Sequence, residues 1–451
     1  MPASPTVPAS LLAVLGKLRV FTAPGFITFT AMVTGLVAQT GASTVTGMLT
    51  GAGLARAWPH DRAHAFFSRT RWNVDNLGIV LAHLIVKTLF PDGAAITVAV
   101  DDTLFKRSGK KVFGAAWQHD GAARGPKPVG RGTCFVVVGI VVELPFLTRP
   151  VCLPVMARLW RPKTGPTKVE LAASMVKLLA VCLNRPLHVV ADAAYHGRAL
   201  RHLPEAITLT TRLPASAVLF DLAPPPTNKR GRPRLKGARL GTPAELAATA
   251  TFTTTRVARY GRTDQVRIAE VRCLWYGSFH TQTVRVILIR DEDTTTGYDL
   301  ALVTTDLATP AVALVTTDLA TPAVALVTRY AWRWSIETTF AEARTLLGVG
   351  QARSRTENAV RRTVPFGLYC YTITVVWYAL HGHHPSDAAD HRARAPWYTT
   401  KTEPSFADML AKLRRVIIAA RFLPVAPGQP TDAEIQAVHH AWAQAGLRHT
   451  A

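Results

Sequence analysis

Acidic residues are scarce in this chain. Asp and Glu number 29 against 52 Lys and Arg, which gives a formal net charge of +23 and an isoelectric point near 10.4. Only 18% of the residues are charged, so the imbalance comes from missing acids rather than from a surplus of charge. A protein this basic favours a polyanionic partner, most often nucleic acid, with an anionic membrane surface as the weaker alternative.

Cysteine is also sparse. The five cysteines are scattered along the chain, are odd in number and form no Cys-x-x-Cys pair. This spacing argues against a disulfide framework and against a zinc ribbon. We therefore expect the reducing cytoplasm as the setting of this protein.

Long uninterrupted hydrophobic runs are missing as well. The apolar stretch at 26–42 is diluted by Thr, Gln and Gly, and begins too far from Met1 for a signal peptide. The stretch at 364–380 is short for a membrane span and mixes aromatic with polar residues. We expect a buried helix there and no membrane partner.

The length of 451 residues predicts roughly three domains of about 150 residues each. Apolar residues recur at helical spacing up to about residue 90, which predicts an all-helical domain over 1–92. The basic composition of the chain makes this domain a candidate for DNA binding. A catalytic core is expected over 93–380, and a C-terminal helical region over 381–451.

The predicted core opens with β-branched runs. Three of them, at 96–102, 134–144 and 149–160, precede a stretch of helical period at 167–183 and a further apolar strand at 187–195. Strand, strand, strand, helix, strand is the order that opens a ribonuclease-H-like α/β fold with a mixed sheet.

The pattern then changes. Residues 201–298 are rich in strand signals and predict a β-rich insertion within the core. The segment ALVTTDLATPAV occurs twice in succession, at 301–312 and 313–324, which indicates a local duplication. Either copy could supply the next sheet strand, and Pro322 is placed to begin the following helix.

Three acidic positions stand where a metal-dependent nuclease would need them. Asp101 and Asp102 end the first strand, Asp192 ends the fourth, and Glu337 lies on the helix after the insertion. Carboxylates that converge from different elements could bind two Mg²⁺ ions, with Mn²⁺ as a substitute. Adjacent strand residues point to opposite faces, so only one of Asp101 and Asp102 is expected to be a ligand.

The sequence around Glu337 adds a second pattern. Tyr330, Arg333, Glu337 and Arg344 follow one another at steps of three, four and seven, which keeps all four on one face of a helix. An ordinary amphipathic helix with an exposed Arg/Glu pair would show the same periodicity.

These residues resemble the insertion-sequence DDE transposases whose third carboxylate lies in a Tyr-x2-Arg-x3-Glu-x6-Lys signature. Tyr330, Arg333 and Glu337 match in type and spacing, whereas Arg344 stands where Lys is usual. In this group the first carboxylate is commonly followed, after one residue, by Thr or Ser. The resemblance of Asp101-Asp102-Thr103 to this pattern favours Asp101 as the first ligand, with Asp102 as the alternative. The resemblance covers about 96–380. It implies that Asp101, Asp192 and Glu337 are catalytic and bind the metal, and that Tyr330, Arg333 and Arg344 contact DNA.

A basic strip inside the insertion provides another nucleic-acid signal. The run Lys-Arg-Gly-Arg-Pro-Arg looks like an AT-hook core, which lies in a narrow minor groove. A disordered basic loop that contacts phosphates without sequence preference is the alternative. The residues expected to bind DNA are Lys229, Arg230, Arg232, Arg234 and Lys236.

Taken with the resemblance, these patterns predict a DNA transposase that binds the inverted-repeat ends of a mobile element and then cleaves and transfers strands. Synapsis of two ends implies a dimer on DNA, with element ends and target DNA as partners. The alternative is a non-catalytic DNA-binding protein, either a decayed transposase or an AT-hook-like regulator.

Overall fold

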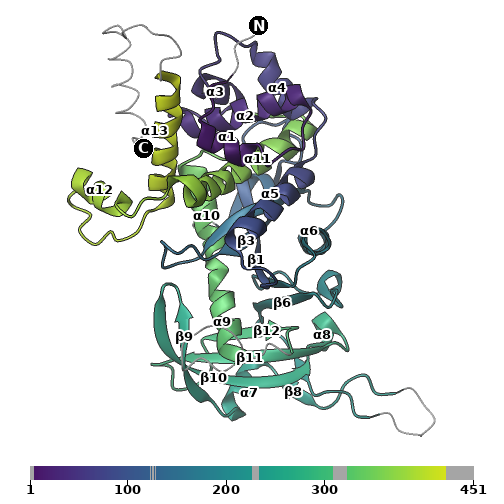
Figure 1. The fold of residues 1–451 in the computed structure, drawn as a ribbon. Coiled ribbons are helices and arrows are strands. Elements are labelled where there is room, and N and C mark those ends of the chain that lie inside the picture. The colour runs from purple at the N-terminus through teal and green to yellow at the C-terminus, as the bar shows by residue number, and fades with distance from the viewer. Residues whose placement is uncertain are drawn as a thin grey trace.

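A computed structural model describes residues 5–121, 123, 126, 128–225, 233–307 and 322–422 of the chain. It shows one continuous mixed sheet, with helices gathered around the N-terminus at one end and a strand-rich part at the other (Figure 1). The α/β class is as predicted, with a ribonuclease-H-like mixed sheet, a β-rich insertion and helical regions at both ends.

The core of the sheet has the spatial order β4-β3-β1-β5-β6. Strand β3 runs antiparallel to both β1 and β4, whereas β5 and β6 run parallel to β1. The bounds are β1 Ile96–Lys106, β3 Val129–Val142, β4 Val151–Trp160, β5 Leu187–Ala191 and β6 Ile207–Arg212.

The strands predicted from β-branched runs all lie in this one sheet, as does the later strand expected at 301–305, which is β12 (Leu300–Thr304). A short edge strand, β2 (Ala116–His119), extends the sheet beside β3. Almost every residue of β3 is buried, which is why its sequence reads as an unbroken apolar run.

Helices cover the sheet. Helix α6 (Lys168–Leu183) begins at a capping box, in which Thr167 Oγ1 accepts from the Glu170 amide and the Glu170 carboxylate accepts from the Thr167 amide. It packs against β3 and β4. Helix α10 (Trp334–Thr345) and helix α11 (Glu357–Trp377) contact β4, where Thr339 and Thr372 donate to its carbonyl groups. These hydroxyls occupy acceptors that an edge strand would otherwise leave open.

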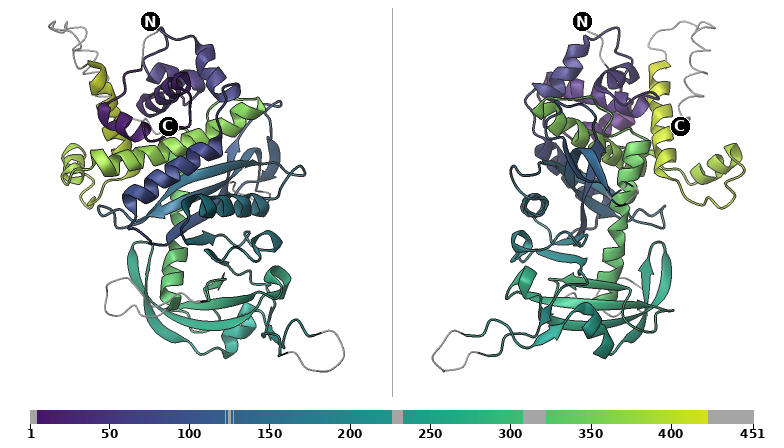
Figure 2. Two further views of the ribbon diagram at one scale, coloured as in Figure 1. Left: turned by 45° about the vertical axis from the view of Figure 1, so that its right-hand side comes forward. Right: turned by 180° about the vertical axis from the view of Figure 1, so that it is seen from behind.

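Helix α11 is the centre of the N-terminal helices (Figure 2). Arg362 on α11 donates to the carbonyl groups of Phe67, Thr70 and Trp72, and so fastens the helices to the core. The bounds are α1 Ala9–Leu15, α2 Ala23–Ala38, α3 Val45–Gly51, α4 His60–Ser68 and α5 Val74–Leu89.

Within the described residues, the stretch Glu357–Gly382 is long and apolar enough to cross a membrane. It consists of α11 and a π-helical extension, η2 (Tyr378–Gly382). Of its apolar window, 89% is buried inside the molecule. Such burial is typical of a core helix, which is apolar on every side.

The insertion joins the core through β12, which pairs antiparallel with both β6 and β11. The range predicted as insertion, 201–298, therefore includes β6 of the same sheet. A short helix, η1 (Arg198–Leu200), precedes this range. The other elements within it are β7 Leu219–Phe220, β8 Arg239–Gly241, α7 Pro243–Thr249, β9 Thr253–Arg259, β10 Arg262–Leu274, α8 Tyr276–Phe279 and β11 Thr283–Asp291.

Helix α9 (Pro322–Trp332) packs on the insertion strands, and its residues form a second hydrophobic cluster with them. The first copy of the duplicated segment supplies β12, and α9 begins within the second copy. Residues 308–321, which join the two elements, lie outside the described residues.

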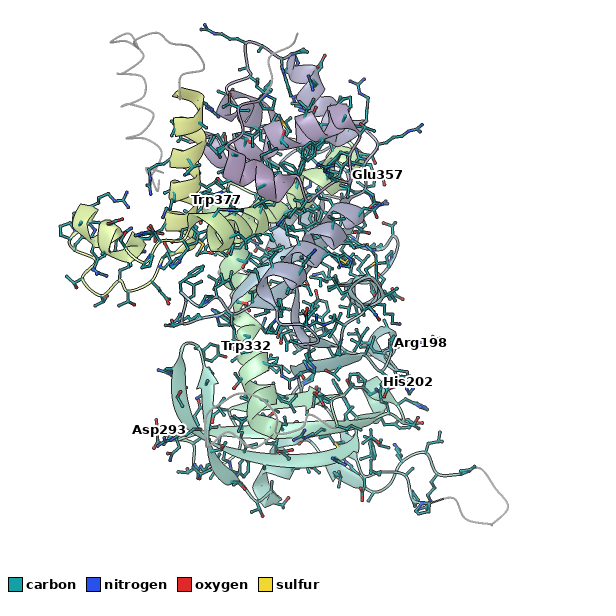
Figure 3. All side chains as sticks on the ribbon, viewed as in Figure 1. Arg198, His202, Asp293, Trp332, Glu357 and Trp377 are labelled. Carbon is teal, nitrogen blue, oxygen red and sulfur yellow. The ribbon has the colours of Figure 1, made fainter. Side chains whose placement is uncertain are left out.

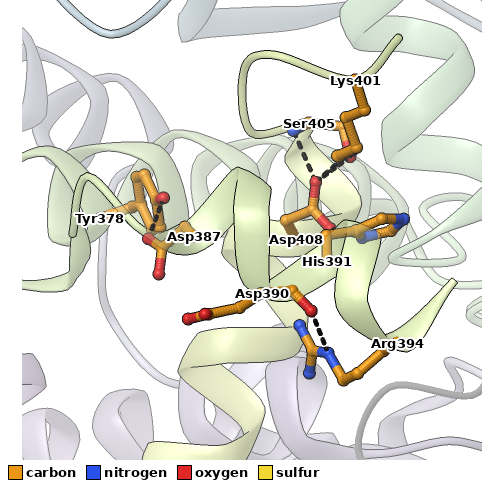
Figure 4. A network of polar contacts seen from close by, with 8 residues as sticks. All are labelled: Tyr378, Asp387, Asp390, His391, Arg394, Lys401, Ser405 and Asp408. Atoms are coloured by element: carbon orange, nitrogen blue, oxygen red, sulfur yellow. Dashed lines mark hydrogen bonds and ion pairs between the residues drawn. The ribbon is translucent and has the colours of Figure 1, made fainter. Parts of the chain in front are cut away.

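Beyond η2, two helices are tied together by ion pairs (Figure 4). They are α12 (Asp387–Arg394) and α13 (Phe406–Phe422). Asp408 accepts from His391 at 2.7 Å and from Lys401 at 2.6 Å, and Asp387 accepts from Tyr378 and from Lys412. The described part of this region thus places its charged side chains in mutual contacts. Residues 423–451 lie outside it.

Replacement of Gly78 by alanine should destabilise the protein, because a Cβ atom there would lie 1.7 Å from the Val155 carbonyl oxygen and 2.8 Å from the Tyr369 hydroxyl. Helix α5 would have to move away from β4, at a cost of about 1–3 kcal/mol. Thermal unfolding should show a lower midpoint. Gly277→Ala is the control, since nothing lies within 4 Å of the position that its methyl group would take, and it should unfold like the parent protein.

Candidate active site

Strand β1 carries Asp101 and Asp102 side by side and sends their side chains to opposite faces of the sheet. Asp101 contacts Arg333, which precedes α10, whereas Asp102 contacts Lys168, the first residue of α6. The two adjacent carboxylates therefore lie in different environments, and each can be assessed by its own contacts.

Arg333 connects Asp101 with Glu337. Its Nη1 lies 3.4 Å from Asp101 Oδ2 and 2.9 Å from Glu337 Oε1. The Arg333 side chain is only 12% exposed, and that of Asp101 19%, so water screens this group of charges weakly. One cationic group thus joins two acidic side chains that come from distant parts of the sequence.

Arg333 occupies the joint between α9 and α10, and keeps helical backbone angles of φ −50° and ψ −37°. Trp332, labelled in Figure 3, marks this joint between the core and the insertion. The Arg333 guanidinium lies 5.8 Å from the ring of Tyr330, which is buried in the cluster formed by α9 and the insertion strands. Packing of the insertion therefore helps to position Arg333.

Asp192 reaches the same end of the sheet from β5. Val100 is paired with Ala191 in the parallel β1–β5 ladder, so Asp101 and Asp192 follow these partners at the same level. Thr211 Oγ1 and the Tyr195 amide both donate to the Asp192 carbonyl oxygen and fix the turn. Burial raises the pKa of Tyr330, and the Asp192 charge adds to this effect. Burial lowers the pKa of Arg333, but Tyr330 and the nearby carboxylates, Asp192 among them, together outweigh burial and raise it.

Asp102 is engaged in a different network. Its carboxylate accepts from Lys168 Nζ at 2.6 Å, from the Tyr195 hydroxyl at 3.0 Å and from Cys134 Sγ at 3.3 Å. Sequence reasoning does not single out Lys168 or Tyr195. The one sequence feature that could have pointed to them is their place in the chain. Lys168 is the first residue of a capped helix, and Tyr195 ends the turn that follows β5.

Burial raises the pKa of Asp101 to about 7, against the opposing effects of the Asp102 amide and of Arg333. A buried carboxylate whose ionisation is disfavoured in this way would gain from a divalent cation, which prefers hard oxygen ligands. Within the described residues, no three His, Cys, Asp or Glu side chains come close enough together to hold a metal ion as they stand. Arg333 supplies the positive charge between Asp101 and Glu337.

The other predicted DNA contacts lie apart from this group. Arg344 is two turns farther along α10, where its guanidinium is 5.4 Å from the Phe105 ring. Arg234 is exposed, and Lys236 Nζ lies 3.7 Å from the Phe220 ring and 5.1 Å from that of Tyr276. Of the basic strip, Lys229, Arg230 and Arg232 fall outside the described residues.

Exchanging each neighbouring aspartate for asparagine should change stability in opposite directions in metal-free protein. The folded pKa of Asp101 lies near 7 and its ordinary value is 3.8, so ionisation costs folded-state stability above about pH 7 and costs none below about pH 4. Asp101→Asn should therefore raise the free energy of unfolding by about 1–4 kcal/mol near pH 8 and leave it unchanged near pH 4.

Asp102→Asn is the matched control. It removes the charged acceptor of Lys168 and Tyr195 and should lower the free energy of unfolding by about 1–3 kcal/mol near pH 8. Urea unfolding in the presence of a chelator measures both variants. Loss of stability in Asp101→Asn at both pH values would contradict the assigned effect of burial.

Comparison with known proteins identifies the family of the chain. The family described as DDE superfamily endonuclease matches residues 28–273, whereas no curated protein matches the chain. The matched range is more than half of the chain. It contains Asp101 and Asp192, and ends before α10. Such endonucleases act on DNA and generally depend on divalent metal ions. By this match, the chain belongs to the DDE superfamily endonuclease family.

Proposed function

We propose that the protein is a DNA transposase of the insertion-sequence group with the Tyr-x2-Arg-x3-Glu-x6-Lys signature. It would bind the inverted-repeat ends of a mobile element, cleave phosphodiester bonds there and join the released ends to target DNA. The observation that carries this proposal is the bridge from Asp101 through Arg333 to Glu337, because it brings the third carboxylate of the signature to the first.

The metal ligands in this proposal are Asp101, Asp192 and Glu337, with Asp102 as the alternative to Asp101. The contacts of Asp102 argue for Asp101, since three donors already occupy the Asp102 carboxylate. Among the described residues, the donors to the Asp101 carboxylate are Arg333 and the Asp102 amide. The three proposed ligands come from β1, from the end of β5 and from α10.

Two Mg²⁺ ions, or Mn²⁺ in their place, would supply an activated water and stabilise the leaving 3′ oxygen when bound. The residues of the chain have other tasks. Arg333, held between two carboxylates, would orient the scissile phosphate, and the buried Tyr330 beneath it would fix the guanidinium. Arg344, farther along α10, would contact a neighbouring phosphate.

The N-terminal helices and the basic strip of the insertion are the proposed contacts for the element ends. Two ends must be brought together for strand transfer, so the protein would act as a dimer on DNA. The high positive charge supports binding of a polyanion, and we place this activity in the cytoplasm, on the DNA of a bacterial-type cell.

Mutation of the proposed ligands should separate cleavage from DNA binding. Asp101→Asn, Asp192→Asn and Glu337→Gln should each abolish Mg²⁺-dependent nicking of DNA that carries the element ends, because each removes an anionic ligand. Each should still bind that DNA. Nicking of labelled DNA measures the first property, and a gel shift in a chelator measures the second.

Asp102→Asn is again the control. It should retain nicking, and it should still bind Mn²⁺ as measured by electron paramagnetic resonance, whereas Asp101→Asn should lose Mn²⁺ binding. The reverse result would assign Asp102 as the ligand. Parent protein that binds the ends but never nicks them with Mg²⁺ or Mn²⁺ would favour the non-catalytic DNA-binding protein.

The basic strip allows a separate test. Replacing Arg230, Arg232 and Arg234 by alanine should weaken DNA affinity and reduce the slope of log affinity against log salt by up to about one for each lost phosphate contact. Binding isotherms at several salt concentrations measure this slope. An unchanged slope would show that the strip does not contact DNA.

A further inference from the structure

A solvent-exposed tryptophan lies on the same face of the sheet as Asp101, well away from it. Trp117 is on the edge strand β2, and its side chain is 70% exposed. An exposed indole ring offers a flat face on which a nucleic-acid base can stack. No contact in the site described above involves Trp117.

The strand register places Trp117 relative to Asp101. Asp101 is paired with Val137, and the register of β1 with β3 continues without a bulge to the end of β1. Arg131 is six residues from Val137, so it points to the same face, and Trp117 is its cross-strand partner on β2. Six residues of strand span about 20 Å, which equals about six nucleotides along one strand of DNA.

Cationic residues lie on the strand beside Trp117 and on the loop that leads into β2. The Arg131 guanidinium donates to the carbonyl groups of Arg107, Gly109 and Lys110, and so holds the loop that carries the exposed side chains of Lys110 and Lys111. The only acidic residue at 105–121 is Asp120, and it is buried in an ion pair with Lys106. The positive charge of this loop is therefore uncompensated.

A buried arginine on the same face points to an anionic ligand. Arg107 donates through Nη1 to the Ala352 carbonyl, but its Nε and Nη2 are buried without a hydrogen-bond partner among the described residues. Nε of Arg344, whose guanidinium lies near Phe105 on this face, is also buried without a hydrogen-bond partner among the described residues. Donors left unsatisfied in this way are costly, and the two guanidinium groups add positive charge that favours an anion on this face.

We propose that Trp117, Lys110 and Lys111 form a binding track for single-stranded DNA, in which an unpaired base about six nucleotides from the cleaved bond stacks on Trp117. The inference rests on the proposed function for the identity of the polyanion. Stacking on an aromatic ring beside a positively charged groove is the general mode of single-strand binding, and it needs no particular base sequence. The track would hold a strand that has been separated from its complement near the cut.

The test measures DNA affinity by fluorescence anisotropy in a chelator, so that no cleavage occurs. The probes are a labelled duplex with a single-stranded extension of about ten nucleotides and the same duplex without it. Trp117→Ala should weaken binding of the extended duplex by at least about fivefold, which is the lower end for loss of one stacked base, and leave the blunt duplex within about twofold. Trp117→Phe should keep most of the affinity, since the ring remains.

Trp397→Ala is the matched control, because Trp397 has a similar exposure of 72% but lies after α12. It should bind both probes like the parent protein. Lys110→Ala combined with Lys111→Ala should lower the salt slope for the extended duplex by about 1.4, given about 0.7 for each phosphate of a single strand.

Equal affinity of Trp117→Ala and parent protein for the extended duplex would overturn the track, whether or not the protein cleaves DNA. The track would also be overturned if the parent protein bound the extended duplex no more tightly than the blunt one. It would be overturned too if Trp117→Ala changed the self-association of the protein but not its DNA affinity. Loss of affinity in Trp117→Ala in a protein that never nicks DNA would contradict the transposase activity and leave the track standing.

Discussion

The alternation of side chains along β1 is the constraint on which the site depends. Two consecutive aspartates must face opposite sides of the sheet, and each side has its own helix. Asp102 meets the lysine that opens α6, whereas Asp101 meets the arginine at the start of α10. A slip of one residue in the β1–β3 register would exchange the faces of the two aspartates. Asp102 would then face α10, and Asp101 would face α6.

The joint between α9 and α10 links the site on β1 to the insertion. Helix α9 packs on insertion strands, and Arg333 at its end is held between Asp101 and Glu337. Its position therefore depends on the hydrophobic contacts of one region and on the charges of another. The insertion thus has a positional role at the site in addition to any contact it makes with DNA.

The strands of the core could be predicted because β-branched residues fill both faces of a buried sheet and leave an unmistakable run. Strand β6 falls in the predicted insertion, since its alternation of apolar residues with Thr reads equally well in either place. Spacing correctly put Arg333 beside Glu337. Periodicity places Arg344 on the same helix face as Glu337, but it does not show whether the two side chains lie close together. Two helical turns separate them by about 11 Å, and the Arg344 guanidinium lies at the Phe105 ring. The sequence could not show that Trp117 shares a sheet face with Asp101, because this depends on how β1, β3 and β2 are paired.

The pairing of β12 with β6 has a consequence for how the chain folds. About 90 residues separate these partners, so this ladder closes a long loop and β6 must wait for a strand that is made much later. Until then β6 presents an unpaired edge with an apolar face, which is the kind of surface on which chains associate. Strand β12 is therefore the element that closes the β6 edge, and a chain truncated before β12 would leave that edge open to other copies of the same protein.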